Sequence, residues 1–224
     1  MTQFPSRVPE NARTARTRRA VLGLMALFSA PVALSSSALI APAFAQSAAV
    51  SPINDLYAAL GQIQAPASGT AEARAQIVAP VIDRSFDLST VLHNSIGMRY
   101  TTLSADEQSR LLAAFRQFTI ARYVSSFKKG GGAKFTVSPT TRPAPTGGST
   151  IVNTTIGDGG DSSTAINYVM MPSGGGYRIV DILLNGHISQ VAAQRADFSS
   201  TLAKGGADAL VTLLNRKTAK FMNN

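Results

Sequence analysis

The sequence contains no cysteine and no tryptophan, and its only histidines are His93 and His187. Without cysteine, the chain forms no disulfide, no zinc–thiolate or iron–sulfur centre and no cysteine nucleophile. Two histidines are too few for a multi-histidine metal centre, so we predict neither a metal nor a cofactor. Charged residues make up 15% of the chain and apolar residues 45%. That composition is typical of a chain with a packed core rather than a disordered one.

The first 45 residues have the pattern of an export signal. An apolar run follows a basic start, and Ala43-Phe44-Ala45 offers small residues where a signal peptidase reads them, which predicts cleavage before Gln46. Arg18-Arg19 also resembles a twin-arginine signal, so the export route stays open between that pathway and the general secretory one. Pro31 and Pro42 make the segment a poor permanent membrane span. We therefore expect a periplasmic protein.

Residues 46–224 have the size of one domain. Much of the formal charge of +9 belongs to the predicted signal. The remaining basic residues are scattered rather than gathered in a stripe with aromatic residues, so we predict no nucleic-acid binding. A mild positive field favours contacts with anionic membrane surfaces or acidic partner proteins. We expect the protein itself to be a monomer. The candidate basic residues for such contacts are Lys128, Lys129, Arg216, Lys217 and Lys220.

Apolar residues recur with a helical period over residues 51–128. They predict a helix beginning at Ser51-Pro52, a second helix that Pro80 bends or splits, and a short third helix before Gly97. The strongest helix signal is the capping box that begins at Ser104. Behind it lies an apolar stripe that defines a long helix ending at glycines 130–132.

The pattern becomes alternating over residues 133–185, which is typical of strands. Short turns rich in glycine, proline and aspartate separate the strands, so we predict a four-stranded antiparallel sheet. Helices resume over residues 187–221, which makes the domain α+β. The four predicted strands are Lys134–Ser138, Thr150–Ile156, Thr164–Met171 and Tyr177–Leu184.

Four segments occur in an order and spacing that resemble the MlaC or toluene-tolerance family of periplasmic lipid-carrying proteins. They are Phe86–Ser104, Phe115–Tyr123, Tyr177–Gly186 and Arg195–Phe198. The segments Ile188–Arg195 and Gly205–Ala207 are more similar to the hopanoid-associated branch of that family, HpnM, than to the phospholipid branch. Tyr177 departs from the family, in which tryptophan is frequent at that position.

The resemblance implies an NTF2-like curved sheet, a helical subdomain and an apolar cavity between them that holds lipid tails. It also implies a non-enzymatic carrier that shuttles hopanoid or phospholipid between an inner-membrane transporter and an outer-membrane complex, and so maintains the outer membrane. The candidate cavity residues are bulky and uncharged, although core packing alone accounts for any one of them. They are Met98, Phe115, Phe118, Phe127, Phe135, Val137, Val169, Met171, Val180, Ile182 and Leu184.

Two charged residues interrupt apolar patterns near the end of the chain. Arg195 lies in the apolar stripe of the helix that follows Ile188, and Asp181 lies in the last predicted strand. Because buried charges are usually paired, we expect an ion pair between them. The alternative is that Arg195 contacts a ligand head group at the mouth of the cavity.

No nucleophile elbow, phosphate loop, dinucleotide fingerprint or metalloprotease motif is present. An enzyme on an NTF2-like scaffold that acts on a lipid-like substrate remains the alternative function, and it predicts His93 or His187 in the cavity near a carboxylate. A purely structural envelope protein, the third alternative, predicts a filled core. Residues 157–161 have the faint look of a calcium loop, which we interpret as a turn.

Overall fold

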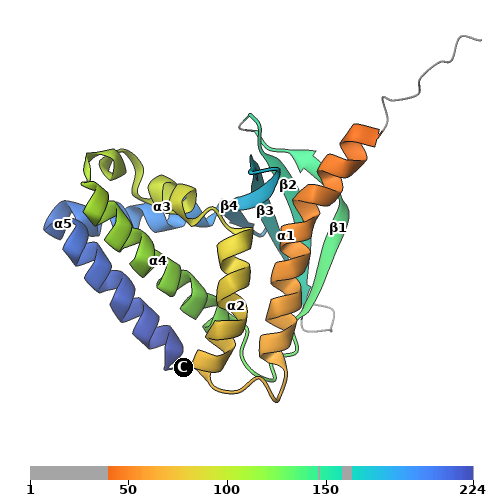
Figure 1. The fold of residues 1–224 in the computed structure, drawn as a ribbon, viewed down its shortest axis with the longest axis horizontal. Helices are drawn as coiled ribbons and strands as arrows, with labels where there is room; N and C mark the ends of the chain where they lie inside the picture. The colour runs from red at the N-terminus through yellow and green to blue at the C-terminus, as the bar shows by residue number, and fades with distance from the viewer. Residues whose placement is uncertain (1–39, 146, 158–162, 224) are drawn as a thin grey trace, which may run out of the picture. The chain divides into compact units, whose positions relative to one another are not determined.

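The structure is a computed structural model, and it describes residues 40–145, 147–157 and 163–223 (Figure 1). All of them belong to one of the two units into which the chain divides, residues 37–224. Residues 1–39 of the predicted signal lie outside the described part, and residues 40–45 are the start of the first helix. Of the turn predicted at residues 157–161, Gly157 is the last residue of β2, and residues 158–161 lie outside the described part.

The helices gather on one side of the sheet (Figure 1). The helix predicted from Ser51-Pro52 in fact begins earlier and includes Pro52, and the second helix runs through Pro80 without being split. Side chains cap the N-termini of α2, α3 and α4, and the cap of α4 is the predicted capping box of Ser104 and Glu107. The helices before the sheet are α1 Ile40–Gln64, α2 Ala71–Ser85, α3 Leu88–Ile96, the 3₁₀ helix η1 Gly97–Thr102 and α4 Ala105–Ser126.

Helix α5, Gln190–Met222, follows the sheet and is kinked in its middle. Gly205 and Gly206 have non-helical dihedral angles there, and Gly206 has a φ of 65°, in the left-handed region that glycine adopts without strain. The predicted division into two C-terminal helices near Ala207 therefore corresponds to this kink.

The sheet is antiparallel with strand order β1-β2-β3-β4-β5. It has five strands, so the prediction of four strands is wrong. The additional strand contains only Ile188 and Ser189, which pair with the end of β4 after a turn in which Asn185 has a φ of 50°. A two-residue strand is too short to show an alternating pattern, and Ile188 fits the following helical period equally well. The strands are β1 Lys134–Pro143, β2 Thr150–Gly157, β3 Ser163–Ser173, β4 Gly176–Leu184 and β5 Ile188–Ser189.

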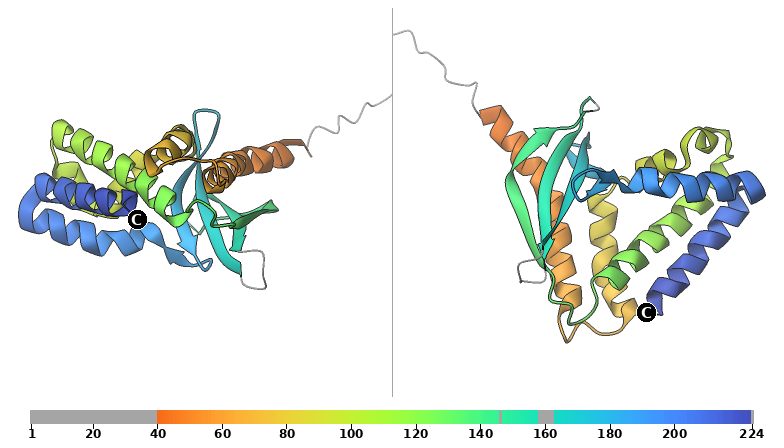
Figure 2. Two further views of the ribbon diagram at one scale, coloured as in Figure 1. Left: turned by 90° about the horizontal axis from the view of Figure 1, so that it is seen from below. Right: turned by 180° about the vertical axis from the view of Figure 1, so that it is seen from behind.

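The two faces of the sheet carry different residues because side chains alternate along each strand. The register across β2, β3 and β4 places Val152, Tyr168 and Ile182 on one face, here called the inner face. It places Val169 and Leu183 on the opposite, outer face. Helix α1 packs on the inner face at β1 and β4, and the view from behind shows the strands in front of α1 (Figure 2).

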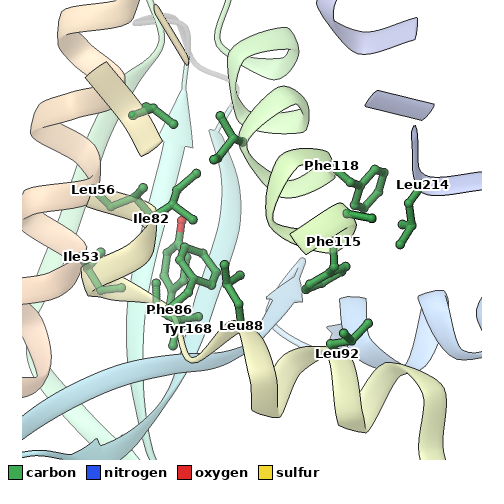
Figure 3. Packing of buried hydrophobic residues seen from close by; sticks show 14 of the residues in the cluster. Ile53, Leu56, Ile82, Phe86, Leu88, Leu92, Phe115, Phe118, Tyr168 and Leu214 are labelled. Atoms are coloured by element: carbon green, nitrogen blue, oxygen red, sulfur yellow. The ribbon is translucent and has the colours of Figure 1, made fainter. Parts of the chain in front are cut away.

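A hydroxyl and an aromatic stack attach α1 to the inner face. The Tyr57 hydroxyl hydrogen-bonds to Thr154 Oγ1 at 2.6 Å, and the Tyr57 ring stacks on Phe135 with 4.4 Å between ring centroids. Helices α3, α4 and α5 form a second layer whose aromatic centre is Phe115, Phe118 and Phe198. Figure 3 shows Phe86 and Tyr168 beside the sheet, and Phe115 and Phe118 on the side of α4.

Candidate functional site

A cavity of about 180 Å³ lies between the inner face of the sheet and the layer formed by helices α3, α4 and α5. Its walls come from the inner face at the ends of β2, β3 and β4 and from helices α3, α4 and α5. Most of the lining is aromatic or aliphatic. The apolar lining residues are Phe86, Leu88, Val91, Phe115, Phe118, Tyr123, Phe127, Ile156, Ile166, Ile182, Leu184 and Val191.

Burial changes from one part of the lining to another. Phe86, Leu88, Phe115 and Phe118 are at most 9% exposed. Apart from the buried Thr119, the polar lining residues are more accessible, and they lie on the C-terminal half of α4, on β4 and on the first turns of α5. The cavity therefore has an apolar, buried end and a polar end that reaches solvent. The polar residues with intermediate or high exposure are Arg122, Ser126, Asp181, Gln190 and Gln194.

Hydrogen bonds between helices fix the polar end. Arg122 Nη2 donates to Gln190 Oε1, which connects α4 to α5. Ser95 Oγ donates to Gln194 Oε1 at 3.1 Å, which connects α3 to α5. The side chains at the mouth thus hold three helices at set positions around the opening.

Asp181 anchors the junction between the sheet and α5. Its carboxylate accepts hydrogen bonds from Ser189 Oγ at 2.5 Å, from the Ile182 backbone N–H at 2.7 Å and from the Val191 backbone N–H at 3.1 Å. Ser189 in turn caps α5 by accepting from the Ala192 N–H. Because these donors satisfy the Asp181 carboxylate locally, it needs no cationic partner.

The expected ion pair between Asp181 and Arg195 is not formed, so that prediction is corrected. Arg195 is exposed, and its Nε and Nη2 donate to the Asn94 carbonyl at 3.1 and 2.7 Å. Carbonyls in the last turn of a helix lack a partner within that helix, and Arg195 of α5 satisfies one of them, that of Asn94 in α3. It does not line the cavity.

Some of the predicted cavity residues meet in the cavity and others lie elsewhere. Phe135 and Val137 pack against the core of the inner face outside the cavity lining, and Met98 is 87% exposed on η1. The residues that do line the cavity are Phe115, Phe118, Phe127, Ile182 and Leu184.

Three further candidates, Val169, Met171 and Val180, lie on the outer face and are corrected in the same way. There they line an open groove of about 630 Å³, here called the outer groove, together with Ile151 and Leu183. The bulge between Val169 and Met170 shifts the register of β4, which leaves Val180 on the outer side and lets Asp181 line both the outer groove and the cavity. Alternation alone does not reveal such a shift.

Neither histidine lines the cavity. His93 is exposed and stacks on Tyr100, with 5.0 Å between ring centroids. His187 lines the outer groove, and its Nδ1 is 2.8 Å from the Asn185 carbonyl oxygen. Within the described ranges no cluster of histidine, aspartate and glutamate side chains is suited to a metal ion.

Three tyrosines form a group beside the cavity, of which Tyr57 and Tyr168 are buried and Tyr123 is half-buried. Burial raises the pKa of Tyr57, Tyr123 and Tyr168 above the ordinary value of 10.0. Tyr123 lines the cavity, while the Tyr57 ring meets the Tyr168 ring edge to face. All three are therefore neutral hydroxyls at physiological pH, and they add no charge to the site.

Several lining residues were not predicted from the sequence. Phe86 and Leu88 flank the N-cap of α3, and the sequence offered a helix start there without indicating which way its apolar residues face. No local sequence pattern predicts that Arg122 lines the cavity, because its partner Gln190 is 68 residues away in the chain.

The fold and the site define an α+β protein that encloses an apolar cavity, open at one polar end, against an antiparallel sheet. The sequence model described as "MlaC protein" matches residues 51–216, and the chain belongs to that family. A search of curated proteins finds no match.

A solved structure shares the fold: a phospholipid-binding protein from Ralstonia solanacearum in complex with a phospholipid. It is 18% identical to this chain, with a TM-score of 0.65, and the match covers 79% of this chain and 98% of the other. Among the residues described for the present chain, no helix has the length and hydropathy needed to cross a membrane.

Proposed function

We propose that this protein is a periplasmic carrier that holds the apolar tails of a lipid in the cavity and leaves the polar part at the end formed by α4 and α5. The observation that carries this proposal is the change in polarity and burial along the cavity. Phe86, Phe115 and Phe118 are buried at one end, whereas Arg122 and Gln190 reach solvent at the other. An amphipathic ligand has the same division.

Carrying a lipid through water requires an enclosed apolar site. Each exposed CH₂ group costs about 0.8 kcal/mol, so two long chains cost tens of kcal/mol in water. An apolar cavity removes that cost. Family membership and the phospholipid bound to the Ralstonia protein support a lipid as the ligand.

The cavity must enlarge when it loads. Its volume of about 180 Å³ is below the roughly 300–1,000 Å³ of most small-molecule pockets. We infer that the helical layer moves away from the sheet at glycine-containing joints. Gly97, the C-cap of α3 and first residue of η1, has a φ of 76°, and Gly130, between α4 and β1, has a φ of 73°. An engineered disulfide that joins the helical layer to the sheet is expected to block loading.

Finer aspects of the proposal depend on the family resemblance. The lipid is a hopanoid or a phospholipid, and the protein exchanges it with an inner-membrane transporter and an outer-membrane complex. The sheet and helices form an NTF2-like arrangement, and the N-terminal segment is the export signal. The hopanoid alternative depends on the segments near Ile188 and Gly205 that are similar to HpnM.

The test is to express the full precursor in a hopanoid-producing bacterium, purify the mature protein without detergent and identify bound lipid by mass spectrometry. We expect about one lipid per protein. Val91→Trp, in the cavity wall, should reduce that occupancy strongly, because the indole occupies space that the tails need. Val211→Trp, at a half-buried position of α5 outside the lining, is the matched control. A lipid-free protein, or equal occupancy in both variants, would contradict the proposal.

A further inference from the structure

Arg122 is the one basic side chain in the lining of the cavity, as far as the described residues extend. It lies on α4, is half-buried and belongs to the polar end. Removing a guanidinium from water, even partly, is unfavourable unless a partner compensates for the charge. The surroundings of Arg122 therefore indicate which partner it lacks.

Helix α4 provides an internal comparison because it carries two other arginines outside the cavity. Arg110 and Arg116 each form ion pairs with aspartates. Arg122 instead donates to the neutral side-chain amide of Gln190, and none of the four ion pairs between described residues includes it. A guanidinium has five N–H donors, so donors remain for a ligand.

Asp181, the one acidic residue in the described lining, does not supply the missing charge. Its carboxylate accepts from Ser189 Oγ and from two backbone N–H groups at the start of α5 and the end of β4. Asp181 thus serves the β4–β5–α5 junction, and the cavity presents the Arg122 cation with a neutral neighbour.

We propose that Arg122 binds the anionic group of the lipid and makes the cavity selective for lipids that carry a phosphate or a carboxylate. This inference depends on the proposed function, because it names the ligand chemistry of the same cavity. The planar guanidinium matches the oxygens of either anion with two parallel hydrogen bonds. Gln190 orients the guanidinium at the mouth, where the ligand's polar group lies when its tails fill the buried end.

A neutral lipid does not satisfy this arrangement. A hydroxyl or an ester offers single neutral acceptors, which neither neutralise the guanidinium charge nor pair with two of its parallel N–H donors. The geometry therefore favours an anionic phospholipid or a fatty acid over diacylglycerol or a neutral hopanoid.

The test is a competition for the delipidated protein. Vesicles contain equal amounts of phosphatidylglycerol, a fatty acid, diacylglycerol and a neutral hopanoid, and mass spectrometry quantifies the lipid that the protein takes up. We expect the wild type to enrich the anionic lipids over diacylglycerol by about tenfold or more. The ratio of phosphatidylglycerol to fatty acid identifies which anion Arg122 binds.

Substitutions assign the preference to a residue. Arg122→Gln should abolish the preference while uptake of diacylglycerol continues, and Gln190→Ala should weaken the preference. Arg99→Gln removes the same charge from an exposed position on η1, outside the lining, and should retain the preference. Circular dichroism verifies that each variant is folded.

Two results would overturn the inference: a wild type that loads lipids without preference, or an Arg122→Gln variant that still prefers anions. A wild type that takes up none of the four lipids is a different result, because it overturns the proposed carrier function itself.

Discussion

The inner and outer faces of the sheet are built from neighbouring residues of the same strands, yet their surroundings differ. On β3, Met170 is completely buried on the inner face, whereas the next residue, Met171, is 41% exposed on the outer face. On β4, Ile182 lines the enclosed cavity and Leu183 lines the open outer groove. Both faces are apolar in this region. The helices that cover the inner face, and not the strand sequence, determine which face becomes an enclosed site.

A carboxylate introduced on β4 should affect lipid binding strongly on the inner face and hardly at all on the outer face. Ile182→Asp places a carboxylate against the tails, and burying an unpaired charge costs several kcal/mol, so lipid occupancy should fall by about 100-fold. Leu183→Asp makes the same chemical change on the outer groove and should leave occupancy close to that of the wild type. Lipid per folded protein, measured after detergent-free purification, is the readout. If only Leu183→Asp lost its lipid, the ligand would lie on the outer face, which contradicts the proposal.

The two methionines of β3 test the same contrast through stability. Met170→Ala should lower the free energy of unfolding by about 2–5 kcal/mol, because it leaves a cavity in the core. Met171→Ala removes the same atoms from a partly exposed site and should cost less than about 1 kcal/mol. Urea denaturation of both variants measures the difference. Similar losses would show that the outer face is covered in solution.

The tyrosines on the inner side of the sheet should make the stability of the protein depend on pH. The pKa values of Tyr57, Tyr123 and Tyr168 are raised by folding, so the folded state keeps protons that the unfolded state loses above pH 10.0. Stability is therefore unaffected by these groups below pH 10.0 and decreases above it, by about 1.4 kcal/mol per pH unit for each tyrosine.

Thermal denaturation between pH 8 and 12, with tyrosinate absorbance as a second signal, checks this expectation. Tyr57→Phe keeps the ring and should make the decrease with pH shallower. Tyrosinate absorbance from Tyr57, Tyr123 or Tyr168 in the folded protein near pH 10 would show that their environment is wetter than the structure indicates.

The smallest expected effect concerns two adjacent threonines of β2. Thr154 is 3% exposed and hydrogen-bonded to the Tyr57 hydroxyl, so Thr154→Val should cost about 1–3 kcal/mol by leaving that hydroxyl without its partner. Thr155 is exposed on the outer face, and Thr155→Val should change stability by no more than about 0.5 kcal/mol. Chemical denaturation of the two variants is the measurement. Equal costs would mean that the hydroxyl pair does not connect α1 to the sheet.

Local signals predicted much of the fold. The Ser104 capping box and the stripe behind it predicted α4, and alternation predicted the four longer strands. Features that depend on tertiary contacts were not predictable. Helix α1 extends through Pro52, and β5 is a two-residue strand that exists because it pairs with the end of β4.

The candidate site was partly predictable for a similar reason. A helix with one apolar stripe indicates which side is buried, so Phe115 and Phe118 were found. Strands that are apolar on both faces do not indicate which face lines a cavity. The prediction that Met171 lines the cavity is therefore wrong, since Met171 lies in the outer groove. Arg122 and Gln190 form a hydrogen bond between α4 and α5, and no local sequence pattern predicts that contact.

Photolabelling can locate the lipid tails on one face of the sheet or the other. The protein is loaded with a phospholipid that carries a diazirine near the end of one acyl chain, irradiated, and mapped by peptide mass spectrometry. We expect labels on the apolar lining of the cavity, Phe115, Phe118 and Ile182 among them, and none on the outer face. Labels concentrated on Val169 and Met171 would show that the lipid occupies the outer groove, and would contradict the assignment of the inner cavity as the binding site.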